Sequence, residues 1–127
     1  MPKPSTPRPT DAELSILRVL WQRGPSTVRQ VQEELGADTG YTTVLKFLQI
    51  MTEKRLVMRD DSQHAHVYQT SLAEEETQRQ LVADLLERAF SGSSKKLVLQ
   101  ALSAKKASAE ELAEIRKLLD DMERRSR

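Results

Sequence analysis

The chain has no cysteine, only 4% aromatic residues and no long apolar run. The absence of cysteine excludes disulfide bonds, thiolate metal ligands and a cysteine nucleophile. No apolar stretch approaches the roughly 18 residues that a membrane-spanning helix requires, and the N-terminus lacks the apolar core of a signal peptide. These features predict a cytoplasmic, helical protein with a large polar surface.

An excess of charge of one sign is also missing. The 127 residues include 20 Lys and Arg against 19 Asp and Glu, for a net charge of +1. Residues 1–70 have nine basic and eight acidic side chains, and residues 71–127 have eleven of each. Composition alone therefore does not indicate nucleic-acid binding, and any positive surface must be local.

Few side chains could carry out catalysis. The only histidines, His64 and His66, are predicted on one face of a strand, and a His-x-His pair can ligate a metal. With only Asp60 and Asp61 as nearby acidic ligands, we expect the histidines to be exposed or near a phosphate instead. The sequence has no glycine-rich phosphate loop and no nucleophile paired with a base. We therefore predict no enzymatic activity, no metal and no cofactor.

Two helices are predicted in the first 40 residues. Thr10 and Glu13 form a capping box that opens the first helix, and Gly24 ends it. Ser26 or Thr27 caps a second, short helix. The apolar side of the first helix carries Leu14, Leu17, Leu20 and Trp21, and that of the second carries Val28, Val31 and Leu35.

A third helix with two different faces is predicted from about Tyr41 to Lys54, after a breaker-rich turn at 36–40. Its apolar stripe consists of Val44, Phe47, Leu48 and Met51. The opposite face consists of Thr42, Lys46 and Gln49, with Thr43 and Ile50 on the flank. A helix face in solvent usually carries more Glu and Lys, whereas a face that contacts base edges favours side chains of this kind.

Two short strands, 56–59 and 65–69, are predicted around a polar loop at 60–64. Three helices followed by a hairpin is the order of a winged helix-turn-helix, in which the third helix enters the major groove of DNA. Arg59 would then contact a phosphate, and the alternative is a solvated surface arginine. Tyr41 either fills the turn between helices or touches the DNA backbone.

Residues 71–127 predict three further helices, which begin at caps formed by Ser71, Ser94 and Ser108. The segment 97–102 is apolar nearly all round and is expected to be buried. About 55 residues cannot readily bury these stripes alone, so we expect a second copy of the chain, rather than the N-terminal domain, to cover them. The side chains expected at this dimer interface are Leu81, Leu85, Leu97, Leu99, Leu102, Leu112, Ile115, Leu119 and Met122.

The predicted fold is mainly α with a small β-hairpin: a winged helix-turn-helix plus a C-terminal helical dimerisation module. Residues 1–10 are expected to form a disordered proline-rich tail. Residues 11–70 would form the DNA-binding domain, and residues 71–127 the dimerisation domain.

Several segments, in order along the chain, resemble the penicillinase-repressor (BlaI/MecI/CopY) family. They are residues 10–21, 24–31, 40–44, 54–57, 66–68 and 94–99, together with the last helix. The resemblance implies a homodimeric bacterial repressor that binds a pseudo-palindromic, double-stranded operator. It also implies that Thr42, Thr43 and Lys46 lie on the part of the recognition helix that faces the groove.

In the better-known family members, a membrane-bound metalloprotease sensor detects a signal, the repressor is cut in its C-terminal module, and the operator is freed. The resemblance implies a cut near Gln100 and Ala101. The chain departs from the family at three points. The β-lactam repressors have Asn-Phe at the cut, and copper-responsive relatives carry C-terminal cysteines, which are absent here. Arg55 stands where many relatives have glycine, so either a left-handed turn there is strained or the turn differs.

The near-zero net charge keeps one function of another class open: a winged helix that binds a protein partner and not DNA. A repressor released by a small molecule is a third possibility. No set of aromatic side chains that could line a pocket supports it.

Overall fold

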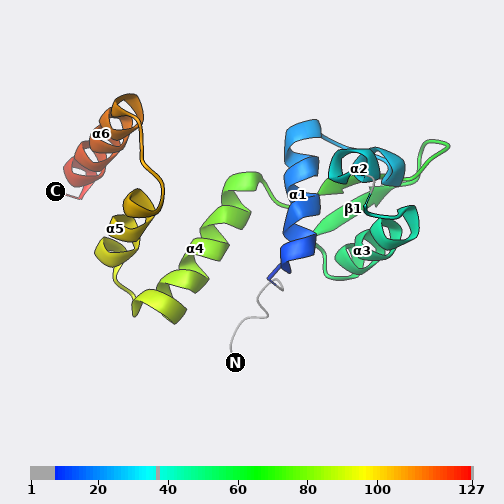
Figure 1. Cartoon of the computed structure of the whole chain (residues 1–127), viewed down its shortest axis with the longest axis horizontal. Coiled ribbons are helices and arrows are strands. Elements are labelled where there is room, and N and C mark those ends of the chain that lie inside the picture. The colour runs from blue at the N-terminus through cyan, green and yellow to red at the C-terminus, as the bar shows by residue number, and fades with distance from the viewer. Residues whose placement is uncertain (1–7, 37, 127) are drawn as a thin grey trace. The chain divides into compact units, whose positions relative to one another are not determined.

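The computed structural model describes residues 8–36 and 38–126 (Figure 1). Contacts divide the chain into one unit that ends at Leu81 and a second that starts at Val82. Within the described residues, no helix is both long and apolar enough to cross a bilayer. The elements of this part of the chain are α1 (Asp11–Arg23), α2 (Val28–Leu35), α3 (Tyr41–Glu53), β1 (Val57–Asp60), β2 (Val67–Thr70), α4 (Glu74–Phe90), α5 (Ser94–Ala104) and α6 (Ala109–Arg125).

The predicted capping box starts α1. The Glu13 amide donates to Thr10 Oγ1 (3.2 Å), and the Thr10 amide donates back to Glu13 Oε1 (2.9 Å). The helix ends at Gly24, whose φ of 88° suits a residue without a Cβ. Ile16 is buried beside the predicted Leu17 and Leu20, while Leu14 and Trp21 are only partly buried. The predicted apolar side was therefore right but too narrow.

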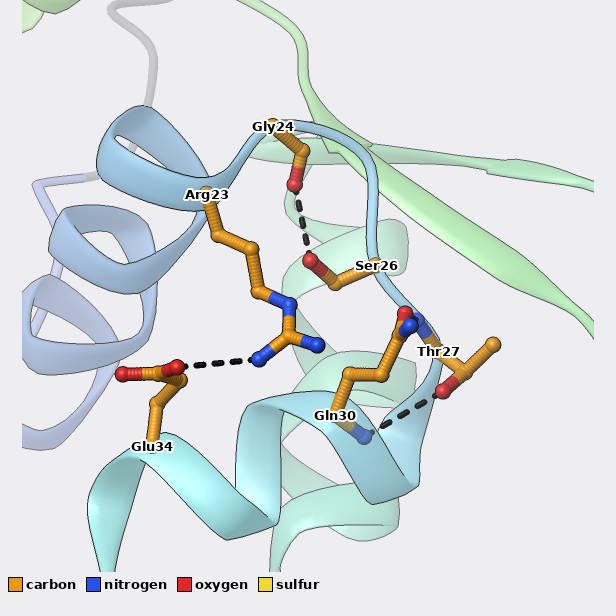
Figure 2. Close-up of polar contacts among 6 residues, drawn as sticks. All are labelled: Arg23, Gly24, Ser26, Thr27, Gln30 and Glu34. Atoms are coloured by element: carbon orange, nitrogen blue, oxygen red, sulfur yellow. Dashed lines mark hydrogen bonds and ion pairs between the residues drawn. The ribbon is translucent and has the colours of Figure 1, made fainter.

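Thr27 caps α2, so the choice between Ser26 and Thr27 is settled (Figure 2). The Gln30 amide donates to Thr27 Oγ1 (3.2 Å), and the Gln30 side chain accepts from the Thr27 amide (2.9 Å). Ser26 instead donates its hydroxyl to the Gly24 carbonyl (2.8 Å) and exchanges two backbone hydrogen bonds with Tyr68. This short bridge ties the turn before α2 to the second strand of the hairpin.

An ion pair between Arg23 Nη1 and Glu34 Oε1 (2.9 Å) joins the ends of α1 and α2 (Figure 2). Both side chains are well exposed, so the pair contributes little stability. The packing of α1, α2 and α3 rests on their apolar faces instead. The buried core consists of Ile16, Leu17, Leu20, Val28, Val31, Val44, Leu48, Met51, Leu56, Val57 and Tyr68.

The strands β1 and β2 are antiparallel, with Val57 opposite Thr70 and Asp60 opposite Val67. Each begins and ends later than we predicted. His64 and His66 therefore lie in the loop, and the prediction that they share a strand face was wrong. The physical reason is that the loop satisfies its own polar groups: Asp60 Oδ1 accepts the Ser62 amide (2.9 Å), and Asp61 binds the His66 ring.

The predicted starts of two C-terminal helices, α4 and α5, were wrong. Ser71 does not cap α4, which begins at Glu74, because the Ser71 amide donates to the Leu56 carbonyl beside the hairpin (3.0 Å). Ser93, and not Ser94, caps α5 by accepting the Lys96 amide (3.2 Å). The predicted cap Ser108 does open α6.

The apolar side chains of the second unit are not covered within one chain. We predicted a buried segment at 97–102, yet Val98, Leu99 and Leu102 are exposed. The expected burial of this segment is therefore not seen in the single chain, and it stays a prediction for the dimer. Among the described residues, Thr77 is the only buried side chain of α4, and α5 and α6 have none.

Candidate nucleic-acid interface

The outer face of α3 is exposed and contains little charge. Thr42, Lys46 and Gln49 follow one another at helical spacings and are all solvent-exposed, and Thr43 is exposed on the flank. No acidic residue lies in the first turn of α3. Because Val44, Leu48 and Met51 are fully buried on the opposite side, this face is rigidly presented to solvent.

A groove, here called the wing groove, runs between α2, α3 and the hairpin. It brings together Tyr41, Gln49 and Arg59, three of the side chains that we predicted to contact DNA. Thr42 and Lys46 do not line it, and Thr43 lines a second groove beside α1. The wing groove is lined by Thr27, Val28, Arg29, Tyr41, Leu45, Gln49, Arg59, His64, Ala65, His66 and Tyr68.

Arg29 is a basic residue of this groove that sequence reasoning missed. Its guanidinium carbon lies 5.7 Å from the centroid of the Tyr41 ring, within the range of a cation–π contact. Tyr41 is 43% exposed and so does not fill the turn between the helices. The only available signal was that Arg29 is the one basic residue of α2, whose first turn faces the DNA backbone in a helix-turn-helix.

The hairpin contains an exposed charge cluster. Arg59 Nε lies 2.8 Å from Asp61 Oδ1, and the Asp61 charge raises the pKa of the Arg59 guanidinium. Hydrogen bonds from Ser62 lower the pKa of the neighbouring Asp60 carboxyl. In the described part of the chain, no three His, Asp or Glu side chains come together in a way that could hold a metal ion.

The side chains predicted at the dimer interface lie on α4, α5 and α6. Leu81, Leu97 and Ile115 are half-buried. The other six are between 36% and 64% exposed: Leu85, Leu99, Leu102, Leu112, Leu119 and Met122. Gln100 and Ala101, at the predicted cut, are exposed in the middle of α5.

Comparison with known proteins identifies the family. The family model described as "Penicillinase repressor" matches residues 9–121. The chain is 34% identical over 116 residues to the transcriptional regulator BlaI of Mycobacterium tuberculosis, covering 89% of this chain and 83% of that protein. It is 18% identical over 116 residues to a penicillinase repressor of Staphylococcus aureus, covering 90% and 92%.

A solved structure supports the fold independently. A MarR family protein from Bacillus stearothermophilus matches 92% of this chain and 74% of its own, with a TM-score of 0.50 and 17% identity. At that identity the match supports the winged helix-turn-helix fold and carries no functional detail. The family model spans nearly all of the described residues, so the chain belongs to the penicillinase repressor family.

Proposed function

We propose that the chain is a transcriptional repressor that binds double-stranded operator DNA in the cytoplasm. The observation that carries the proposal is the exposed, weakly charged outer face of α3, next to a hairpin that carries Arg59. The names of its relatives, a transcriptional regulator and a penicillinase repressor, agree with it.

The proposed contacts divide into two kinds. Thr42, Thr43, Lys46 and Gln49 would reach base edges in the major groove, because a helix inserted there presents one such face. Tyr41 and Arg59 line the wing groove and would contact the sugar-phosphate backbone. Arg29 adds a third backbone contact from α2. Backbone contacts would supply affinity, and the α3 side chains specificity.

We propose that a second copy of the chain covers the exposed apolar side chains of α4 to α6. A unit of this size cannot build a core by itself, and these helices leave leucines exposed that a soluble monomer would bury. One winged helix contacts only one half-site, whereas a dimer reads two half-sites of a pseudo-palindromic operator. A second copy would thus cover the exposed leucines and supply the winged helix that binds the second half-site.

We propose that a membrane-bound metalloprotease sensor releases the repressor by cutting α5 near Gln100 and Ala101. Both residues are exposed, but α5 must open locally before a protease can bind an extended strand. The cut would break the helix that carries Leu97, Leu99 and Leu102 and would weaken the dimer. Mass spectrometry of the chain from cells with and without a co-expressed membrane-bound metalloprotease tests this. A chain that stays intact while its operator is freed contradicts it.

The function itself is tested by measuring binding of the full chain to a duplex from upstream of its own gene, across a salt series. A repressor should lose affinity steeply as salt rises, because each neutralised phosphate releases counterions. A shuffled duplex of equal length should bind more weakly. Absence of salt-dependent binding to either duplex would favour the alternative, a winged helix that binds a protein partner.

A further inference from the structure

One carboxylate oxygen in the hairpin loop holds two basic side chains at once. Asp61 Oδ1 lies 2.8 Å from Arg59 Nε and 2.7 Å from His66 Nδ1. Arg59 lies in β1, one residue before its end, and His66 directly precedes β2, so Asp61 bridges the two sides of the loop. Arg59 is also the residue opposite Tyr68 in the strand pairing, and it lines the wing groove.

This cluster is not needed to hold the hairpin together. All three side chains are about half exposed, and ion pairs in water add little stability. The hairpin is held instead by its strand pairing, by the burial of Val57 and Tyr68, and by the backbone bridge from Tyr68 to Ser26. The Asp61 contact therefore matters for the availability of the Arg59 guanidinium and not for the stability of the hairpin.

We propose that Asp61 is an internal competitor of the DNA backbone for Arg59. In the free protein the carboxylate binds the guanidinium, and a phosphate oxygen replaces it when DNA enters the wing groove. This inference rests on the proposed function. Both partners of Arg59 are anionic oxygen acceptors of similar geometry, so the exchange replaces one charge-assisted hydrogen bond with another.

The competition lowers the affinity for DNA without changing which DNA sequence is preferred. A phosphate that reaches Arg59 comes close to Asp61, and two negative charges at that distance repel. The effect does not depend on which bases lie in the major groove, because α3 carries the base contacts. Asp61 therefore lowers binding to operator and unrelated DNA by the same factor. With a net charge of only +1, the chain has almost no excess of positive charge to offset this loss.

Asp60 provides a matched control. It is the adjacent residue, carries the same charge and is exposed like Asp61. Its Oδ1 accepts the Ser62 amide (2.9 Å), and in the described part of the chain no ion pair joins it to Arg59. Asp60→Asn and Asp61→Asn thus remove the same charge from neighbouring positions, and only the second removes the charge that is paired with Arg59.

The experiment measures binding of wild type, D60N, D61N, R59A and the two double variants to the upstream duplex and to a shuffled duplex. D61N should bind both duplexes about three- to ten-fold more tightly than D60N does. In the R59A background, D60N and D61N should bind equally. The D61N melting temperature should stay within about 2 °C of wild type, since the pair is exposed.

Three results would overturn the inference. They are equal affinities of D60N and D61N, a D61N gain that persists in the R59A background, and a gain confined to one duplex. If the wild type binds DNA and any of these results is found, only the proposed role of Asp61 is refuted. Wild type that binds neither duplex removes the proposed function and this inference together.

Discussion

Glu13 and Lys54 form a shielded ion pair between residues 41 positions apart: Lys54 Nζ donates to Glu13 Oε1 at 2.7 Å. The Glu13 side chain is 3% exposed and that of Lys54 26%. Glu13 also closes the capping box of α1, and Lys54 is the C-cap of α3. The pair therefore joins the start of the first helix to the end of the helix that carries the candidate base contacts. Removal of either partner would leave the other charge shielded and unpaired.

The Glu13 pair should make stability depend on pH. Burial by itself raises the pKa of the Glu13 carboxyl, but hydrogen bonds from Lys54 and Thr10 outweigh it and leave the pKa below its ordinary value. A lowered folded-state pKa stabilises the fold above the unfolded-state pKa, and the contribution is lost as pH falls through the folded-state pKa. Glu13→Gln should cost about 1–3 kcal/mol at pH 7. Urea unfolding should show this gap narrowing below about pH 4.

The control for this prediction is Glu33→Gln. Glu33 is an exposed carboxylate on α2, so its substitution should change the unfolding free energy by less than about 0.5 kcal/mol. A Glu13→Gln deficit of constant size from pH 7 down to pH 3 would mean that shape and not charge accounts for the loss.

Lys46 is expected to contribute to operator recognition. It is exposed in the centre of the outer face of α3, between Thr42 and Gln49. Lys46→Ala should weaken binding to the upstream duplex by about 1–3 kcal/mol if the ammonium group contacts a base edge. Arg18→Ala on α1 removes one charge from the same unit, outside the wing groove, and serves as control. An unchanged isotherm for Lys46→Ala removes this residue from the interface.

Local signals in the sequence located most of the fold. These signals act within one or two turns of a helix, so they can be recognised without knowing what the helix packs against. They are the capping box at Thr10, the glycine at position 24 and the apolar spacing of Val44, Leu48 and Met51. Boundaries that depend on contacts distant in the sequence cannot be predicted this way. The Ser71 amide donates to the Leu56 carbonyl on the other side of the hairpin, so Ser71 does not cap α4, and this helix begins at Glu74.

The candidate interface was only partly predictable for the same reason. Periodicity selects Thr42, Lys46 and Gln49 because they share a face of one helix. The contact of Arg29 with Tyr41 depends on how two helices pack. The shared acceptor Asp61 depends on the loop closing on itself. No spacing rule in the sequence reports such contacts.

Leu119 is expected to lie at the dimer interface. It is 56% exposed on the seam of α6 that also carries Leu112 and Met122. Leu119→Asp should convert the dimer to a monomer at micromolar concentration in sedimentation, because it buries an unpaired charge between subunits. Ala113→Asp adds the same charge to the opposite side of α6 and should leave the dimer intact. A wild-type monomer at that concentration would contradict the proposed dimer.

Arg55 should be replaceable by glycine with a gain in stability. The left-handed turn is present: Arg55 has a φ of 65°, a conformation that is unfavourable for a residue with a Cβ. The α3 helix ends there in a Schellman motif, in which the Leu56 amide donates to the Met51 carbonyl (2.9 Å) and the Arg55 amide to the Thr52 carbonyl (3.1 Å). Arg55→Gly keeps both bonds and removes the Cβ, so unfolding free energy should rise by about 1 kcal/mol.

The sign of the change in unfolding free energy distinguishes Arg55→Gly from glycine substitutions elsewhere in a helix. Arg18→Gly, in the exposed middle of α1, should cost about 1 kcal/mol, because glycine is a poor helix former. Opposite shifts of the two urea midpoints, with equal slopes, are the expected result. If Arg55→Gly also destabilises the chain, the left-handed turn is compensated by contacts of the arginine side chain.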